Sequence, residues 1–376
     1  METMDNDKRF LEGSYAPVQN GQTVPDWTGA GASDSCGRSC VGVGIKPTPS
    51  ATFRNGVSVP EWSGRFAGRN GASERECSAT EHNDICSIRH IVLSGGMIYG
   101  FAFYGALREL NKKGIWNLQE LKTIYSTSVG CIIATTISLN YDWDVLDKFI
   151  IDRPWHNCFK FSLHSVMNCF QNNGIFKIDT IEEVLYPLLS GKDIPMTVTL
   201  KEFYEITKIE NHYFTVNLNT FQLIDVSYLT HPDWKLVEAI YASCCAPIFF
   251  QPLKKDGTIY TDGGLLSNYP IHQLFESSDE VNESEVLGLH TVATETILKT
   301  KMENSNTLYD YIYSIFAKVM QHLSNKKVWQ PRIQLDFDST FIPVFDLYNV
   351  VNSTEQRTKL VNYGAQLCDE YAGRFN

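Results

Sequence analysis

The chain has 376 residues, a formal net charge of −11 and a hydrophobic fraction of 43%. This composition supplies enough apolar side chains for a large buried core, which α/β domains of this size form as one unit. The acidic balance argues against a dedicated nucleic-acid binder, because phosphate contacts need clustered Lys and Arg. No run approaches the roughly 20 apolar residues of a membrane span, and the N-terminus lacks the pattern of a signal peptide. We therefore expect a cytoplasmic protein that is not secreted.

The ten cysteines fit the same compartment. Six lie in apolar surroundings, which predicts reduced thiols of the core rather than disulfides. These six are Cys131, Cys158, Cys169, Cys244, Cys245 and Cys368. Cys36 and Cys40, taken with Cys77 and Cys86, match no tight zinc spacing. The chain also has no phosphate-loop, calcium-loop or dinucleotide fingerprint, so the sequence implies no cofactor and no metal.

Residues 1–86 differ in composition from the rest of the chain. They hold 11 of the 25 glycines but only one Leu and two Ile. Such a segment buries too little surface to offset the entropy of ordering it, so we expect a flexible tail. Within it, Val24-Pro-Asp-Trp-Thr-Gly29 recurs as Val59-Pro-Glu-Trp-Ser-Gly64. The repeated Trp indicates a duplicated docking motif for a protein partner, and a duplicated spacer is the alternative.

Residues 87–376 have the periodicity of strands and helices. Residues 88–93 form a β-rich run before a glycine turn, and residues 102–113 then have helical spacing. Residues 121–125 are a second predicted strand, followed by a tight turn and a predicted helix over 131–139. This order predicts an α/β domain with a parallel sheet covered by helices. The later predicted elements are strands at 214–218, 223–226 and 258–260 and helices at 235–245 and 353–371.

Three motifs have the residue types of a hydrolytic site. Ser126-Thr-Ser128-Val-Gly130 lies between a predicted strand and a helix, where a nucleophile elbow holds its central Ser in a strained turn. The glycine turn 94–100 can direct backbone N–H groups at a developing oxyanion. The run 261–270 places Asp262 at a strand end, although an Asp-Gly turn alone is common. Two glycine turns on adjacent strands are a more specific signal of a hydrolytic site than either turn alone.

These motifs, with others in the same order, resemble patatin-like phospholipases, and within that family the versions carried by large DNA viruses. The resemblance covers residues 88–372 and does not extend to the tail. The additional matching peptides are Phe101–Leu107, Asn173–Phe176, Thr199–Glu205 and Ala242–Phe250. The resemblance implies a three-layer α/β/α fold with a mainly parallel central sheet behind the tail. It also implies a lipid acyl hydrolase of phospholipids or glycerides, in the host cytoplasm for a viral protein.

The resemblance also implies the roles of the site residues. Ser128 is the nucleophile and Asp262 its general base, and the amides of Gly95, Gly96 and Met97 form the oxyanion hole. The roles of the first two agree with elementary chemistry, because a serine hydroxyl reacts at neutral pH only where a positioned base accepts its proton. An acyl-enzyme then forms on Ser128, and Asp262 activates the water that releases the fatty acid.

A Ser–His–Asp triad is the competing mechanism. His272, His290 and His322 all follow Asp262, as the histidine follows the acid in α/β-hydrolases. Their surroundings carry no catalytic context, and the Asp-Gly-Gly-x-x-x-Asn-x-Pro run that begins at Asp262 favours the dyad.

Three residues depart from the family pattern. Met97 replaces a third loop glycine, which costs about 1–2 kcal/mol where φ is positive. Tyr99 replaces a basic residue, and Ser126 replaces the small glycine that begins the elbow. These departures define an alternative function, a catalytically impaired scaffold whose tail recruits a partner. A hydrolase of small soluble esters is the third hypothesis.

Each of two aromatic segments has two possible structural roles. The first either lines an acyl-chain channel or covers one face of the sheet; its aromatic residues are Trp155, Phe159, Phe161, Phe170 and Phe176. The second, Tyr309–Phe316, is either a membrane contact or a core helix with a solvated basic edge formed by Lys318, Lys326 and Lys327. The net charge opposes binding to anionic bilayers, so we expect membrane contact to be transient.

Overall fold

The computed structural model describes residues 87–160, 169, 171–277, 280–292, 329, 331–338 and 344–372. Several features named above lie outside these residues. They are the tail 1–86 with its repeated Trp peptide and its four cysteines, Phe161, Phe170, His322, and the segment Tyr309–Phe316 with the three lysines after it.

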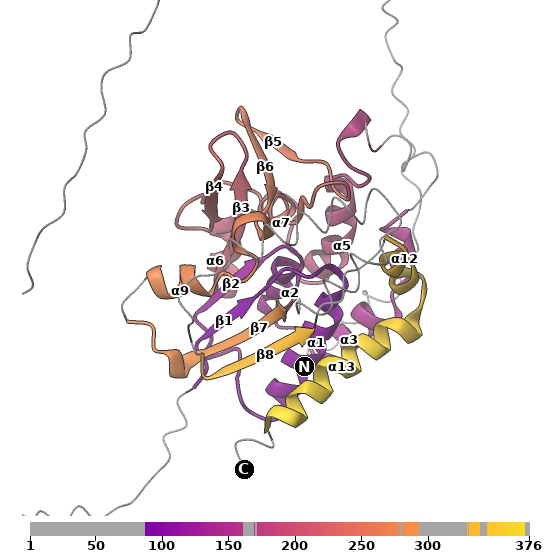
Figure 1. Ribbon diagram of the computed structural model, residues 1–376. Coiled ribbons are helices and arrows are strands. Elements are labelled where there is room, and N and C mark those ends of the chain that lie inside the picture. The colour runs from indigo at the N-terminus through magenta and orange to yellow at the C-terminus, as the bar shows by residue number, and fades with distance from the viewer. Residues whose placement is uncertain are drawn as a thin grey trace, which may run out of the picture. The chain divides into compact units, whose positions relative to one another are not determined.

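One mixed sheet organises the described residues (Figure 1). Its order is β5-β6-β3-β2-β1-β7-β8, and β4 pairs with β3 beside this path. The strands are β1 (His90–Leu93), β2 (Thr123–Thr127), β3 (Glu210–Asn217), β4 (Gln222–Val226), β5 (Leu253–Lys255), β6 (Thr258–Asp262), β7 (Val286–Val292) and β8 (Ile333–Asp338). The pairs from β8 across to β3 are parallel, whereas β4, β6 and β5 pair antiparallel at the β3 edge.

Helices of different lengths connect these strands. The α-helices are α1 (Gly100–Lys112), α2 (Val129–Ser138), α3 (Trp143–Asp147), α5 (Ile178–Ser190), α6 (Leu200–Thr207), α7 (Leu236–Cys244), α8 (Gly264–Ser267), α9 (Ile271–Ser277), α12 (Val344–Asn352) and α13 (Thr354–Ala372). The shorter segments are the 3₁₀ turns η2 (Met97–Tyr99), η4 (Trp155–Asn157) and η5 (Glu283–Glu285) and the π-helical η3 (Lys148–Asp152). Gly105 of α1 and Gly364 of α13 let these two helices touch, because a β-carbon at either would overlap the other backbone.

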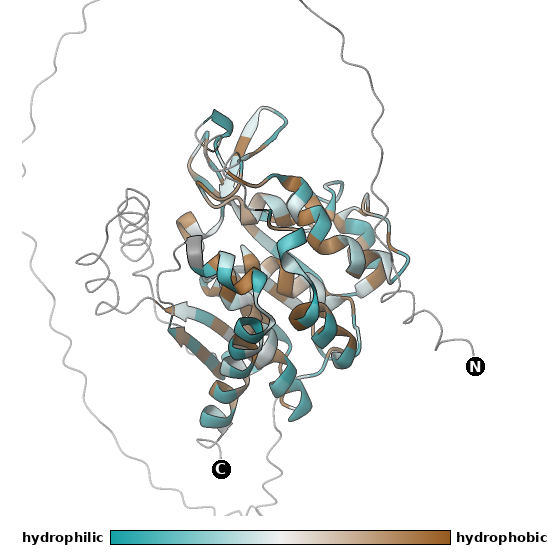
Figure 2. Ribbon diagram, turned by 90° about the vertical axis from the view of Figure 1, so that its right-hand side faces the viewer, coloured by the Kyte–Doolittle hydropathy of each residue, from teal (hydrophilic) through white to brown (hydrophobic). Residues whose placement is uncertain are grey.

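Both faces of the sheet are buried by helices, which gives three layers. Successive side chains of a strand point to opposite faces. Tyr213 therefore faces α2, where its hydroxyl lies 3.0 Å from Oγ1 of Thr135. Phe214, the next residue, packs on the opposite face with Ile271 and Leu274 of α9. Figure 2 shows hydrophobic stretches in the sheet and mixed hydropathy along the surrounding helices. The predicted three-layer fold with a mainly parallel sheet is confirmed.

Within the described residues, the strands and helices predicted between residues 88 and 260 and over 353–371 are present with shifted ends. The second predicted strand begins two residues later and reaches residue 127, because it pairs with both β1 and the longer β3. The six predicted core cysteines are free and buried. Within the described residues, no helix is long and apolar enough to cross a membrane, and no group of three or more His, Cys, Asp or Glu could hold a metal ion.

Candidate active site

Ser128 occupies a sharp turn between β2 and α2. Its backbone has φ 54° and ψ −125°, a left-handed value of φ that non-glycine residues adopt rarely. It is half-buried, while Ser126 and Thr127 before it are fully buried. The turn therefore lifts one serine out of a closed strand at the amino end of a helix, as the elbow motif predicts.

Contacts from neighbouring elements fix this turn. The amide of Ser128 donates to Oγ of Ser243 in α7 at 2.9 Å. Ser126 donates its hydroxyl to the carbonyl of His212 at 3.1 Å, which explains why a serine is accepted where the family has glycine. Gly130 is required, because a β-carbon there would lie 2.8 Å from the carbonyl oxygen of Ser94.

Asp262 ends β6 and lies beside the elbow. Its backbone pairs with Thr215 of β3, and its residue is only 6% exposed. Burial raises the pKa of the Asp262 carboxyl to about 6, and hydrogen bonds from the Gly264 amide and the Ser128 side chain oppose this rise. The Gly264 amide donates to Oδ1 at 2.7 Å. The fold thus brings together Ser128 and Asp262, which are far apart in sequence.

Gly95 links the glycine turn to the segment after Asp262. Its amide donates to the carbonyl of Asn268 at 3.0 Å, and its carbonyl accepts from Oγ1 of Thr291 at 2.7 Å. A β-carbon at Gly95 would lie 2.5 Å from Oδ1 of Asn268 and 3.1 Å from Cβ of Ser128, so a larger residue would have to displace the Asn268 side chain. The Gly95 amide thus already has an acceptor in this structure, and its role as an oxyanion donor stays a prediction. Gly95 also lets the loop approach the serine closely.

The backbone amides of Gly96 and Met97 remain candidate donors to an oxyanion. No hydrogen bond between described residues uses either amide. Met97 has φ 48°, the strained value anticipated for a side chain in place of a glycine. The sequence interpretation missed a further candidate donor, the amide of Val129, which follows the serine at the start of α2. The first amides of a helix have no intrahelical acceptor and form its positive end.

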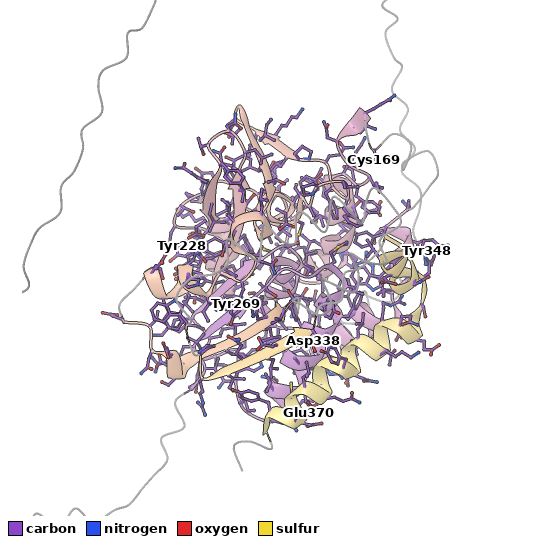
Figure 3. All side chains as sticks on the ribbon, viewed as in Figure 1. Cys169, Tyr228, Tyr269, Asp338, Tyr348 and Glu370 are labelled. Carbon is purple, nitrogen blue, oxygen red and sulfur yellow. The ribbon has the colours of Figure 1, made fainter. Side chains whose placement is uncertain are left out.

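Tyr99 does not substitute for the missing basic residue. Its side chain is buried, and its hydroxyl donates to the carbonyl of Asp338 at 2.8 Å. Asp338 ends β8, above α13 in Figure 3. The residue therefore ties the turn η2 to the far edge of the sheet.

The two described histidines of the competing triad contact other groups. His290 stacks on Tyr269 with ring centroids 4.3 Å apart, and its Nδ1 lies 3.3 Å from Oδ1 of Asp336. His272 accepts a hydrogen bond at Nδ1 from the indole of Trp329 at 3.0 Å. Within the described contacts, neither histidine touches Ser128 or Asp262.

The described aromatic residues of the 155–176 segment belong to the main core. Trp155 and Phe176 are buried and Phe159 is half-buried. Phe159 meets Phe176 edge-on with centroids 5.4 Å apart, and Trp155 meets Phe101 of α1 at 5.7 Å. These contacts favour the interpretation in which the rings cover one face of the sheet.

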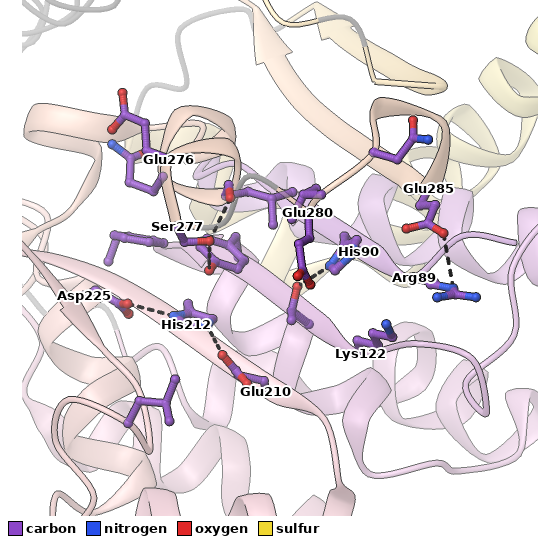
Figure 4. Close-up of a pocket in the computed structure, with 18 residues that line it drawn as sticks. Arg89, His90, Lys122, Glu210, His212, Asp225, Glu276, Ser277, Glu280 and Glu285 are labelled. Carbon is purple, nitrogen blue, oxygen red and sulfur yellow. Dashed lines mark hydrogen bonds and ion pairs between the residues drawn. The ribbon is translucent and has the colours of Figure 1, made fainter. Parts of the chain in front are cut away.

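A cavity of about 830 Å³ lies at the opposite end of the strands (Figure 4). Its lining includes His90, Lys122 and Glu210, which stand at the amino ends of β1, β2 and β3, and it includes neither Ser128 nor Asp262. Parallel sheets of this type bind ligands outside the carboxyl ends of their strands. We therefore place the candidate active site at the elbow and not in this cavity.

The chain is similar to known proteins. A family model described as patatin-like phospholipase matches residues 91–275. An uncharacterised protein of Acanthamoeba polyphaga mimivirus is 30% identical over 61% of this chain and 74% of its own length. A probable lipid hydrolase of Invertebrate iridescent virus 6 is 26% identical over 59% of this chain and 74% of its own length.

Solved structures also align with the chain. VipD from Legionella pneumophila has a TM-score of 0.39 and 15% identity over 73% of this chain and 67% of its own. Human GIVD cytosolic phospholipase A2, in complex with methyl gamma-linolenyl fluorophosphonate, has a TM-score of 0.42. It is 12% identical over 79% of this chain and 59% of its own.

Proposed function

The chain belongs to the patatin-like phospholipase family, and we propose that it is a phospholipase A-type acyl hydrolase acting through a dyad of Ser128 and Asp262. Its substrates are the fatty-acyl esters of phospholipids or glycerides. The observation that carries the proposal is the buried carboxyl of Asp262 beside the elbow, where burial raises its pKa to about 6 and the nearby Ser128 side chain opposes the rise. A base is most effective where its pKa lies near the working pH.

In the first half-reaction, the Ser128 oxygen attacks the ester carbonyl carbon and its proton passes to Asp262. The carbonyl π electrons move to oxygen and give a tetrahedral oxyanion. When this collapses, the C–O bond to the alcohol breaks and Asp262 returns the proton to the leaving oxygen. The products of this step are a lysolipid or glyceride alcohol and an acyl ester on Ser128.

In the second half-reaction, a water molecule replaces the alcohol. Asp262 accepts one proton of the water as its oxygen attacks the acyl carbon. Collapse of the second tetrahedral intermediate breaks the bond to Ser128, whose oxygen regains the proton from Asp262. The fatty acid leaves, and both residues return to their starting states.

Backbone amides stabilise both tetrahedral intermediates in this mechanism. The supporting observations are the unpaired amides of Gly96 and Met97 within the described contacts, and the start of α2 at Val129. Fixed donors directed at a developing oxyanion contribute about 3–4 kcal/mol each in measured cases. Because these donors are backbone groups, the side chain at Met97 does not remove them.

A fluorophosphonate probe and lipid-product analysis test this function. We expect the probe to label the full chain in the presence of mixed phospholipid vesicles, and the labelling to disappear in Ser128→Ala. Asp262→Asn should retain the fold and release no fatty acid. Ser138→Ala is the matched control, because Ser138 is a buried serine at the end of α2, the helix that follows Ser128, and it contacts Asn211 rather than the elbow.

The alternative function, a catalytically impaired scaffold, is supported by one observation, the strained backbone at Met97. Absence of labelling in the wild-type chain with vesicles present would favour that function and reject the hydrolase. The hydrolase of small soluble esters is separated by its kinetics. A lipid hydrolase accelerates when a short-chain lipid passes its micellar threshold, whereas the soluble-ester enzyme shows no such increase.

A further inference from the structure

Two hairpins project together from the edge of the sheet at which Asp262 lies (Figure 1). Strands β3 and β4 are joined by residues 218–221, and β5 and β6 by residues 256–257. The Leu218 amide donates to the carbonyl of Ile259 at 2.8 Å, and the Ile259 amide donates to Oδ1 of Asn219 at 2.9 Å. These bonds join the two loops into one unit, which we call the hairpin tip (residues 218–221 and 254–257).

The hairpin tip exposes two large apolar side chains, and asparagine side chains bond its backbone. Leu218 is 42% and Phe221 54% exposed, two of the six exposed large hydrophobic residues in the described part of the chain. Oδ1 of Asn217 accepts the amides of Asn219 at 2.9 Å and Thr220 at 3.3 Å. Surface turns are ordinarily polar. This turn is pre-organised by asparagine side chains while its apolar residues face outward.

Phe221 has an unusual backbone for its residue type. Its φ is 53°, in the left-handed region that glycine and asparagine tolerate best. Much of the ring remains exposed, so burial in the core does not offset the strain. Strained residues retained at a surface position point to a function for that position.

The charges at the hairpin tip nearly cancel. Lys254 and Asp256 are both exposed. Lys255 is already engaged, because its ammonium lies 3.1 Å from Oε2 of Glu238 and 5.2 Å from the ring centroid of Trp234. The tip therefore lacks the cluster of free basic residues that recognises anionic lipids. Its apolar and near-neutral surface fits a zwitterionic phospholipid interface instead.

We propose that the hairpin tip is the surface through which this protein enters a zwitterionic phospholipid interface, with Leu218 and Phe221 as the inserted side chains. This inference rests on the proposed function and adds the mode of access to its substrate. Asp262 lies four residues from Thr258 along β6, or about 13 Å at the strand rise of about 3.3 Å per residue. Insertion of the tip therefore brings the dyad close to the lipid esters.

Sedimentation with sucrose-loaded phosphatidylcholine vesicles tests the surface independently of hydrolysis. The test variant is the full chain with Leu218→Ser and Phe221→Asn, because asparagine accepts a positive φ. We expect its partition onto vesicles to fall roughly tenfold or more, given the apolar area that two such side chains bury. The matched control is Tyr186→Ser in α5, where the side chain is 58% exposed, and it should bind like the wild type.

The outcomes separate the inference from the proposed function. Hydrolysis of a soluble ester by the tip variant should stay within about twofold of the wild type, because no residue of the dyad changes. Equal vesicle binding by the wild type and the tip variant overturns the inference, even if both hydrolyse esters. A wild-type dimer that the tip variant converts to a monomer overturns it in favour of a second copy of the chain. If the tip variant loses vesicle binding and the wild type hydrolyses no ester, the result supports the proposed surface and rejects the proposed function.

Discussion

The hydroxyl of Ser243 accepts a hydrogen bond from the backbone amide of Ser128, with 2.9 Å between oxygen and nitrogen. The same hydroxyl donates to the carbonyl of Phe214 at 2.6 Å and is fully buried. One side chain of α7 thus joins the nucleophile elbow to β3, the strand that pairs with β6 and hence with Asp262. The distance between Ser128 and Asp262, the proposed dyad, depends on this link.

We predict that Ser243→Ala lowers kcat by about tenfold or more and changes KM little, because small displacements of a reacting group are costly. Unfolding in urea should also show a loss of about 1–3 kcal/mol from the unpaired Phe214 carbonyl and Ser128 amide. Ser227→Ala is the control, since Ser227 is a fully buried serine at the end of β4 that contacts Thr230. A control that lost kcat equally, or a Ser243→Ala variant with normal kcat, would contradict the positioning role.

The raised pKa of Asp262 gives the proposed reaction a defined pH dependence. In that mechanism Asp262 acts as a base only when deprotonated, and burial raises its pKa to about 6 from a usual value near 4. We therefore predict that kcat/KM for a soluble ester rises with pH up to about 6 and is level above it, as for a single essential base in the free enzyme. A profile without a break between about pH 5 and 7 would count against the assignment.

A variant that relieves the backbone strain at Met97 distinguishes the active-enzyme hypothesis from the impaired-scaffold hypothesis. The donor at this position is a backbone amide, which Met97→Gly retains while it relieves a positive φ of 48°. We predict that kcat of Met97→Gly stays within about threefold of the wild type, because the geometry of the donor is unchanged. A gain of two orders of magnitude would instead show that methionine had disabled the oxyanion hole.

The sequence predicted the parts of the fold whose signals are local. The strand, turn and helix around Ser128 follow from a hydrophobic run, a Ser- and Gly-rich turn and helical spacing. Strand β3 was predicted four residues too short at its start, because Glu210 and His212 interrupt the apolar pattern. Each of these polar side chains is paired in the structure, Nε2 of His212 lying 2.9 Å from Oε1 of Glu210.

Contacts between segments far apart in the chain could not be predicted from the sequence. Strand β7 was missed because Gly288 breaks its run, and the reason for that glycine is the Tyr269 hydroxyl, which occupies the space of a β-carbon. The pairing of the Gly95 amide with Asn268 also depends on residues far apart in the chain. Motif matching predicted a donor role for Gly95 but could not show that its amide bonds the Asn268 carbonyl.

His212 is the central residue of a buried ionic group at the cavity (Figure 4). Its ring nitrogens lie 2.7 Å from Oδ2 of Asp225 and 2.9 Å from Oε1 of Glu210, and Tyr125 stacks on the ring at 4.1 Å. Burial alone would lower the pKa of His212, but the hydrogen bonds to the two carboxylates outweigh it and raise the pKa to about 9. The imidazolium therefore holds β3 and β4 together at neutral pH.

This raised pKa predicts how stability changes in alkali. Because the folded-state pKa of His212 exceeds the value of about 6.5 for an unfolded chain, the stabilisation is complete below about pH 6.5 and is lost as pH rises through about 9. We expect the free energy of unfolding in urea to fall by an amount on the order of 3 kcal/mol across this interval. His212→Gln should be less stable at pH 6.5 and should lose most of this slope, since glutamine carries no titrating charge. Parallel pH profiles for the variant and the wild type would show that the slope arises from other groups.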